Sequence, residues 1–379
     1  MRIVLFTPFS PDLGGGAAQL RSHLGQMAIP VEWFYLANQP AGSGIGKLLG
    51  PVFTPTELIA DLSARTGFLP GSRARARELV EKIGAADLYW VVAHYEGIAV
   101  AAELCAQGKK VHVTVHDDPF GTWMRSNRYA PFRPLLRRTF PELLRAAQGI
   151  DVTSWGMRNL YRQKYGVKCF SLYLHVKQLP RLDVARDASQ LTVGHIGTLY
   201  QAEPFRRFVL ACKEVTAESR RKLRIVRIGA SPELAVFSAQ DPDVFESHGD
   251  LSEQQALPLL AGCDFHYAMY PAGRKYELFR RTSLPIKLST YVQSQRPIFA
   301  HTPSDSTLAC VVTKHGLGTV CDGTAIGEIA GEIRKLLSAT VSLINFESAR
   351  ADVMGLPQVQ QLEAALRGEK WEHFRESDC

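Results

Sequence analysis

The stretch MRIVLFTPFSPDLGGGAAQLRSHL, residues 1–24, decides the fold expected of this chain. Ile3–Phe6 is an apolar run long enough for a buried strand, and two prolines interrupt the chain after it. Gly14, Gly15 and Gly16 then lead into a good helix start at Ala17. A strand, a glycine turn and a helix N-terminus together present backbone N–H groups to an anion, and glycine lets the anion approach closely. We therefore predict that Gly15 and Gly16 contact a phosphate.

An ordinary tight turn between strand and helix would use the same residues. The glycine spacing matches neither the dinucleotide motif G-x-G-x-x-G nor the P-loop motif G-x-x-x-x-G-K-[ST]. The phosphate hypothesis therefore depends on the architecture of the rest of the chain.

Strand-like and helical patterns alternate along the first half, which is typical of a parallel, doubly wound sheet. The expected strands are Ile3–Phe6, Val31–Tyr35, Leu88–Ala93, Val111–Val115, Ile150–Thr153 and Lys168–Tyr173. The expected helices are Arg73–Ile83, Ile98–Gln107 and Pro134–Ala147. A polar segment without periodicity, VKQLPRLDVARDASQ at 176–190, reads as a linker.

The same pattern begins again after the linker. The expected strands are Leu191–Ile196, Leu223–Ile228, Phe265–Met269 and Pro297–Ala300, with helices at Arg206–Val215, Pro285–Gln293 and Ile326–Leu337. We therefore predict an α/β protein with two doubly wound, Rossmann-like domains that face each other across a cleft. The expected domains are residues 1–178 and 190–345, with a helical tail over 346–379 that packs back on the first domain. Ligands of such sheets bind beyond the carboxyl ends of the strands.

Charge and cysteine content restrict the possible partners. The net charge of +7 lies in the first half, where residues 1–180 hold 21 Lys and Arg against 13 Asp and Glu. A basic half suits a phosphorylated substrate or an anionic membrane surface, and no zinc-finger or RNA-recognition signature favours nucleic acid. The seven cysteines are scattered, and neither a signal peptide nor a membrane-spanning run is expected. These features indicate a cytoplasmic protein with reduced thiols.

The segment 284–298, LPIKLSTYVQSQRPI, is a second strong signal. Pro285 suits the first turn of a helix, and Lys287 would lie beside the free N–H groups of that turn. This combination predicts a pyrophosphate pocket, although a lone lysine is by default a solvated surface residue.

Four elements in this order resemble a GT-B-fold glycosyltransferase that uses a nucleotide-sugar donor. They are Pro8 to Gly16, Val113 to Asp118, Ile196-Gly197-Thr198-Leu199, and Pro285 to Pro297. The resemblance covers nearly the whole chain and is nearest to family 4 and to bacterial enzymes of the xanthan glucuronosyltransferase type. It implies no bound metal and no cofactor, because the UDP-, GDP- or TDP-sugar is a substrate.

The resemblance places the donor on the second domain and the acceptor on the first. The residues implied to hold the donor are Gly15, Gly16, Gly197, Thr198, Arg206, Gly229, Gly249, Lys287, Leu288 and Thr290, with Gly229 and Gly249 near the base. Two features of family 4 are absent. The paired glutamates would fall at Thr282 and Thr290, and the phosphate lysine after the Gly-Thr-Leu unit is missing, so Arg206 or Arg207 is expected to replace it. Arg274 and Lys275 are further candidates to offset the diphosphate charge.

His116, Asp117 and Asp118 follow an expected strand and are the catalytic candidates. His116 would face the donor sugar or acceptor, and Asp118 or Asp117 would be the general base. Asp118 is preferred because alternate residues of an extended chain point to the same side. A metal site and a simple turn are the alternatives, and Asp12, His94 and Glu96 are lesser candidates.

The stretch Trp123–Arg145 is rich in arginine and aromatic residues. It suits either contact with an anionic bilayer at the inner face of the cell membrane or a helix with an arginine-covered outer face. The function expected is transfer of a sugar to a glycan or lipid-linked acceptor in polysaccharide or glycoconjugate biosynthesis. The alternatives are a sugar-nucleotide epimerase of the same fold and an inactive binding protein, which the missing glutamate pair favours.

Overall fold

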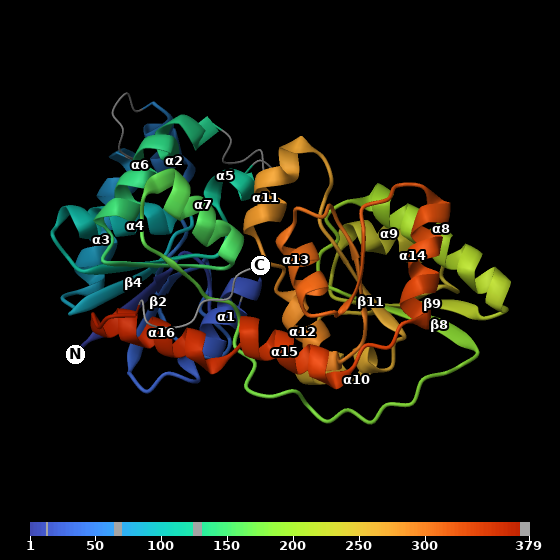
Figure 1. Cartoon of the computed structure of the whole chain (residues 1–379). Helices are drawn as coiled ribbons and strands as arrows, with labels where there is room; N and C mark the ends of the chain where they lie inside the picture. The colour runs from blue at the N-terminus through green and yellow to red at the C-terminus, as the bar shows by residue number, and fades with distance from the viewer. Residues whose placement is uncertain (13, 64–69, 124–130, 372–379) are drawn as a thin grey trace. The chain divides into compact units, whose positions relative to one another are not determined.

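The computed structural model describes residues 1–12, 14–63, 70–123 and 131–371 (Figure 1). The chain divides into two compact units. Among the described residues, the first unit contains Met1–His175, Arg281–Ser283 and 355–371, and the second contains Val176–Arg280 and Leu284–Met354. The tail is therefore divided, because one of its helices belongs to each unit.

In the first unit, the described strands form a parallel sheet of seven in the order β3-β2-β1-β4-β5-β6-β7. These strands are β1 (Ile3–Thr7), β2 (Val31–Leu36), β3 (Lys47–Gly50), β4 (Leu88–Val92), β5 (Val111–Val115), β6 (Gly149–Val152) and β7 (Phe170–Ser171). The helices are α1 (Gly14–Leu24), α2 (Pro55–Leu62), α3 (Pro70–Ile83), α4 (Tyr95–Ala106), α5 (Pro119–Trp123), α6 (Arg133–Ala146), α7 (Trp155–Tyr165) and α16 (Leu356–Arg367). Helices α3, α4 and α6 cover one face of this sheet, and α1 and α16 cover the other (Figure 1).

The central strands β1, β4 and β5 are buried at every position, which explains why β1 and β4 read as apolar runs. A polar chain crosses β4, β5 and β6. Trp90 Nε1 donates to Thr114 Oγ1 at 2.6 Å, and Thr114 Oγ1 donates to Asp151 Oδ1 at 2.6 Å. His112 Nε2 lies 2.7 Å from the same carboxylate oxygen. All four side chains are buried, so these hydrogen bonds replace the water that the polar groups lose on folding.

In the second unit, the described strands form a parallel sheet of six in the order β10-β9-β8-β11-β12-β13. These strands are β8 (Gln190–Ile196), β9 (Lys222–Ile228), β10 (Phe245–His248), β11 (Phe265–Met269), β12 (Ile298–His301) and β13 (Gly318–Cys321). The helices are α8 (Ala202–Ser219), α9 (Pro232–Gln240), α10 (Glu253–Ala261), α12 (Lys287–Ser294), α13 (Thr307–Lys314), α14 (Ile326–Ser338) and α15 (Leu343–Val353). A short 3₁₀ turn, Arg274–Tyr276, leads into α11 (Glu277–Thr282), whose end belongs to the first unit. The two sheets, with helices on both sides, confirm the predicted pair of Rossmann-like units.

Helix α6 contains most of the described part of the arginine-rich stretch and separates its apolar residues from its arginines. Its apolar residues Leu136, Phe140 and Leu144 are buried in the core, whereas its arginines Arg137, Arg138 and Arg145 are exposed. These apolar side chains are therefore not presented to a bilayer, and α6 has the arginine-covered outer face given as the alternative. Residues 124–130 of the stretch lie outside the described part of the chain.

Three further expectations concern membrane, metal and cysteine. Among the described residues, no helix is long and apolar enough to span a membrane. The same residues contain no cluster of three or more His, Cys, Asp or Glu side chains arranged to hold a metal ion. In the described part of the chain, Cys105, Cys169, Cys212, Cys263 and Cys321 are free thiols. Cys310 is disulfide-bonded, so the expectation of reduced thiols does not hold for it.

Candidate functional site

The strand order of the second sheet reverses between β8 and β11, and open α/β sheets bind ligands beyond the strand ends at such a point. Gly197, which follows β8, has a left-handed backbone with a φ of 75°. Gly229, which follows β9, has a φ of 96°, and a Cβ there would lie 3.4 Å from the backbone of Gly197. The Gly229 amide donates to the carbonyl of Gly249 at 3.1 Å. The structure thus brings these three predicted glycines together at the carboxyl edge of the sheet.

Lys287 reaches the same loop from the first turn of α12. Its Nζ donates to the Thr198 carbonyl at 2.8 Å and lies 5.7 Å from the centre of the Tyr200 ring. Burial of the ammonium lowers the pKa of Lys287 to about 7, although part of the side chain remains accessible. An anion beside this nitrogen would replace lost hydration and favour the charged form. The structure thus places the Lys287 ammonium at the Gly197 loop, and the assignment of Lys287 and Thr198 as donor contacts stays a prediction.

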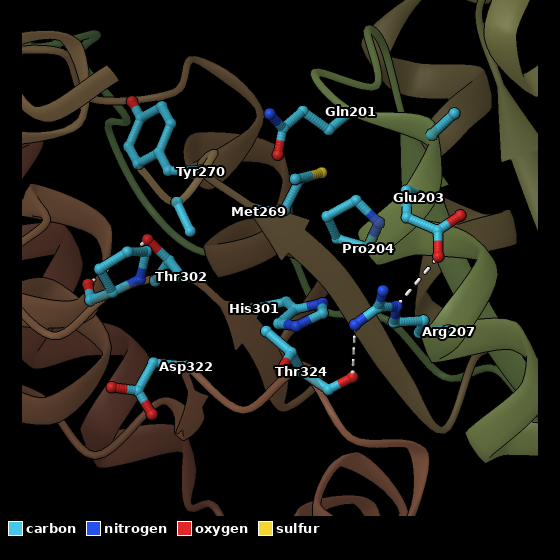
Figure 2. A pocket seen from close by; sticks show the side chains of 13 residues that line it. Gln201, Glu203, Pro204, Arg207, Met269, Tyr270, His301, Thr302, Asp322 and Thr324 are labelled. Carbon is cyan, nitrogen blue, oxygen red and sulfur yellow. Dashed lines mark hydrogen bonds and ion pairs between the residues drawn. The ribbon is translucent and has the colours of Figure 1, made fainter. Parts of the chain in front are cut away.

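A cavity of about 430 Å³ opens at this edge of the second sheet (Figure 2). Its walls come from the first turns of α8 and from the segments that follow β11, β12 and β13. The described lining residues are Gln201, Ala202, Glu203, Pro204, Arg207, Met269, Tyr270, Ala272, His301, Thr302, Pro303, Asp322 and Thr324. Tyr270 stacks on Tyr200 with ring centres 5.7 Å apart, so the cavity adjoins the Lys287 loop. The volume is within the range of small-molecule sites.

Arg207 and His301 are held firmly in this cavity. Arg207 Nε donates to Glu203 at 3.0 Å, and its Nη1 donates to the Thr324 carbonyl at 3.1 Å (Figure 2). His301 Nε2 lies 3.0 Å from the carbonyl of Gly323, which only accepts, so Nε2 carries a proton. Burial lowers the pKa of His301, which keeps the ring neutral, and Nδ1 then accepts from Tyr267 Oη at 3.1 Å. Both ring nitrogens are engaged, so His301 shapes the cavity and is not a free base.

The other predicted donor residues of the second unit are not grouped in this cavity. Arg206 is half-exposed, and its guanidinium lies 5.3 Å from the Phe237 ring centre, whereas the neighbouring Arg207 lines the cavity. The side chains of Leu288 and Thr290 are buried within the unit, Leu288 completely. Their assignment as donor contacts stays a prediction.

The strand order of the first sheet reverses between β1 and β4. Phe9 follows β1, His94 follows β4 and His116 follows β5, and their rings pack together. Gly16, in the first turns of α1, completes this histidine cluster, because a Cβ there would lie 2.7 Å from His116 Nδ1. The structure thus joins Gly16 and His116, which the sequence assigned to donor and acceptor respectively.

His116 is buried, and among the described residues neither of its ring nitrogens has a hydrogen-bond partner. Burial, reinforced by neighbouring His94 and His23, lowers the pKa of His116 to about 3. Burial also lowers the pKa of His94, an effect that the Asp117 carboxylate opposes. Both rings are therefore neutral near pH 7. His116 can exchange hydrogen bonds with a ligand but does not serve as a cationic acid.

Asp117 and Asp118 have different surroundings. Asp118 is buried, and its Oδ1 accepts from the amides of Phe120 and Gly121, both at 2.9 Å, while Oδ2 accepts from Tyr161 Oη at 2.9 Å. Burial raises the pKa of Asp118. Asp117 is less buried and accepts from Ser283 Oγ at 3.0 Å. The alternation used to prefer Asp118 does not hold, because the chain bends at His116 and Asp117 and enters α5 at Pro119.

The sequence did not single out the residues that line the cavity other than Arg207. Met269 ends an expected strand and Tyr270 follows it, while His301 and Thr302 follow another, so the rule that ligands lie at carboxyl ends could have found them. Asp322 follows β13, which was not expected, and therefore carried no signal.

Gly16→Ala is expected to destabilise the first unit by about 1–3 kcal/mol, because the new methyl group would overlap the His116 ring. Thermal or urea unfolding of the purified chain measures the effect. Gly327→Ala on α14 is the matched control, since a Cβ there meets nothing within 4 Å. The double variant Gly16→Ala/His116→Ala should recover part of the loss. A Gly16→Ala protein as stable as the control would show that the two residues are not in contact.

Comparison with solved structures supports the fold. HepE from Anabaena, solved in complex with UDP, matches with a TM-score of 0.65 at 13% identity, over 97% of this chain and 100% of that one. A proposed UDP-N-acetylglucosamine 2-epimerase from Listeria monocytogenes matches with a TM-score of 0.62 at 12% identity, over 100% of this chain and 99% of that one. Sucrose-phosphate synthase from Thermosynechococcus elongatus matches with a TM-score of 0.61 at 12% identity, over 98% of this chain and 96% of that one.

These likenesses show that the chain has the GT-B fold, as the sequence resemblance predicted. No protein-family model matches the sequence. No curated protein matches it either.

Proposed function

We propose that this protein is a glycosyltransferase that takes its sugar from a nucleotide-sugar donor. The observation that carries the proposal is the position of the Lys287 ammonium on the Thr198 carbonyl, beside Gly197 at the reversal point of the second sheet. A diphosphate held there would meet a positive charge and an open backbone. The structural neighbours include a complex with UDP, which supports a nucleotide as the ligand of this fold.

In the proposed reaction, the bond between the donor sugar and the diphosphate breaks, and negative charge grows on the diphosphate. Lys287 would stabilise that charge at the leaving group, and because the nitrogen is already fixed by Thr198, little reorganisation is needed. The nucleobase of the donor would lie near Gly229 and Gly249, as expected from the sequence.

The cavity beside this loop is proposed to take the sugar. Its Arg207 is paired with Glu203, and the exposed carboxylate of Asp322 leaves the lining more acidic than basic. Such a lining suits hydroxyl groups better than phosphates. Glu203 and Asp322 would then accept hydrogen bonds from the sugar. They would take the role of the paired glutamates of family 4, whose positions are occupied here by Thr282 and Thr290.

On the first unit, we propose that the histidine cluster binds the acceptor and that Asp117 takes its proton. Asp118 is less suited to this role because both of its carboxylate oxygens already accept hydrogen bonds from the protein. Asp117 retains carboxylate lone pairs beyond its bond to Ser283, and it lies directly after His116.

Asp117→Asn is expected to reduce sugar transfer at least a hundredfold while leaving nucleotide affinity within twofold of wild type, because only the acceptor side loses its base. Asp118→Asn should instead lower the stability of the first unit, since it disturbs the contacts around α5. Kinetics and unfolding measured on both variants separate the roles. Full transfer by Asp117→Asn, together with its loss in a folded Asp118→Asn protein, would return the assignment to Asp118.

The test of the proposed function is release of free nucleotide from a panel of UDP-, GDP- and TDP-sugars, with and without candidate glycan acceptors. A transferase releases nucleotide in proportion to the sugar transferred. The epimerase alternative, which a Listeria neighbour supports, predicts a changed sugar without any acceptor. Nucleotide binding without either product would leave the inactive binding protein as the function.

We further propose a glycan or lipid-linked acceptor and a role in surface polysaccharide synthesis at the inner membrane face. Since the apolar residues of α6 are buried, Arg137, Arg138 and Arg145 would supply contact with anionic lipid. Binding to phosphatidylglycerol vesicles that persists at high salt would argue against this contact.

A further inference from the structure

The amino-terminal edge of the second sheet, at the opposite ends of the strands from the Lys287 loop, contains another cavity of about 740 Å³. Three arginines from separate segments line this arginine cavity. Arg186 precedes β8, Arg221 precedes β9 and Arg296 precedes β12. Guanidinium groups that converge from three segments on one concave surface are costly unless anions compensate them.

Two carboxylates share the arginine cavity, but both are already engaged. Asp264 Oδ2 accepts from Arg221 Nη2 at 2.9 Å and from the Thr192 amide at 2.9 Å, while Arg186 lies 3.6 Å from Oδ1. The oxygens of Asp187 accept from the neighbouring Ser189 and Gln190. Asp187 therefore holds its own turn and forms no ion pair with the arginines in the described part of the chain.

Arg296 is the arginine left without an acidic partner. Its Nε donates to the Ala261 carbonyl at 2.6 Å, and among the described residues it forms no ion pair. Burial, with a smaller effect of the Arg186 charge, lowers the pKa of Arg296, and the Asp264 carboxylate opposes this lowering only in part, so the charged form is held at a cost. The Nε of Arg221 is buried without a hydrogen-bond partner in the same described residues. The cavity thus retains uncompensated positive charge.

We propose that the arginine cavity binds a small phosphorylated molecule, with its phosphate between Arg186 and Arg296. Arginine suits this role because its planar guanidinium matches two phosphate oxygens at once. The remaining walls include Leu337, Val341 and Pro297, which would contact a less polar part of the ligand. The volume exceeds what a single phosphate needs and is typical of a site for a small organic molecule.

This site is separate from the proposed donor site and does not depend on it. The two cavities lie at opposite ends of the same strands. Phe265 at the start of β11 and Pro297 just before β12 line the arginine cavity, while Met269 and His301 at the ends of these strands line the other one. A ligand in the arginine cavity would therefore contact the same strands that end at the cavity beside the Lys287 loop. Occupancy of one site can be measured in a variant of the other.

Calorimetric titration of the full chain with inorganic pyrophosphate and with phenyl phosphate tests the proposal. Arg296→Gln and Arg186→Gln should each weaken one binding event at least tenfold, while Lys287→Ala leaves that event unchanged. Arg186 is half-exposed, so its variant is expected to fold even if the loss of the Ala261 contact harms Arg296→Gln. Arg334→Gln, which removes an exposed arginine paired with Glu214 and Glu218, is the matched control.

Several outcomes would overturn the proposal. They are the absence of any pyrophosphate or phenyl phosphate binding, binding that neither cavity variant changes, and an equal loss in Arg334→Gln. A binding event lost only in Lys287→Ala would support the donor site and refute the arginine cavity. Failure of the donor proposal alone would leave the arginine-dependent event intact.

Discussion

Lys287→Ala is expected to weaken the binding of nucleoside diphosphates by tenfold to a hundredfold. The reason is that a charge-assisted hydrogen bond contributes about 1.5–3 kcal/mol, and no other lysine is placed to replace this one among the described residues of the Gly197 loop. Calorimetry with UDP, GDP and TDP measures the loss. Affinity should also depend on pH. Below pH 7 the ammonium is already charged, whereas above pH 7 the protein must take up a proton on binding, so affinity falls as pH rises.

Two variants control this experiment. Lys287→Arg retains a positive charge at all relevant pH values, so the fall in affinity above pH 7 should disappear even if the absolute affinity drops. Lys335→Ala removes an exposed lysine that pairs with Glu332 and should leave binding unchanged. Wild-type affinity in Lys287→Ala, or an equal loss in Lys335→Ala, would rule out a specific diphosphate contact.

Asp151→Ala is expected to lower the free energy of unfolding of the first unit by about 3–5 kcal/mol, which is the usual effect of removing one partner from a buried pair. His112 and Thr114 would lose their common acceptor inside the core, where water does not replace it. Urea unfolding followed by the tryptophan fluorescence of the chain reports the change, because Trp90 belongs to the same hydrogen-bonded chain.

The comparison variants make the cause clear. Asp151→Asn keeps an acceptor oxygen in place and should lose less stability than Asp151→Ala. Glu218→Ala removes an exposed partner of Arg334 and should change stability by less than about 1 kcal/mol. A loss in Asp151→Ala no larger than in Glu218→Ala would mean that the buried chain does not stabilise the unit.

The central strands of both sheets were predictable from the sequence, and three of the four edge strands of the described sheets were not. Predicted and observed bounds agree for β5 and β11, which are buried at every position and are rich in the β-branched or aromatic residues that favour strands. The missed strands β3, β10 and β13 all lie at sheet edges, where partly exposed positions weaken the apolar pattern. The remaining edge strand, β7, is shorter than the apolar run that predicted it.

The candidate site was predictable where backbone conformation determines it. Gly197 and Gly229 both adopt left-handed backbone at strand ends, and glycine is the residue that signals this. Side-chain roles were harder to predict. Asp117 and Asp118 are identical and adjacent in the sequence, and only the bend into α5 makes one a helix cap and leaves the other accessible. Likewise, only the direction of α8 places Arg207 rather than Arg206 in the cavity.

The return of α16 to the first unit affects the order in which the protein is made. Leu362 and Leu366 of this helix pack in the same core as Trp90 and Phe170. A ribosome therefore completes the whole second unit before it supplies the last helix of the first. Until then, the nascent first unit exposes an apolar face that α16 will cover. A gene cut after His175 would encode that incomplete state, so separate expression of the first unit requires residues 355–371 to be joined to it.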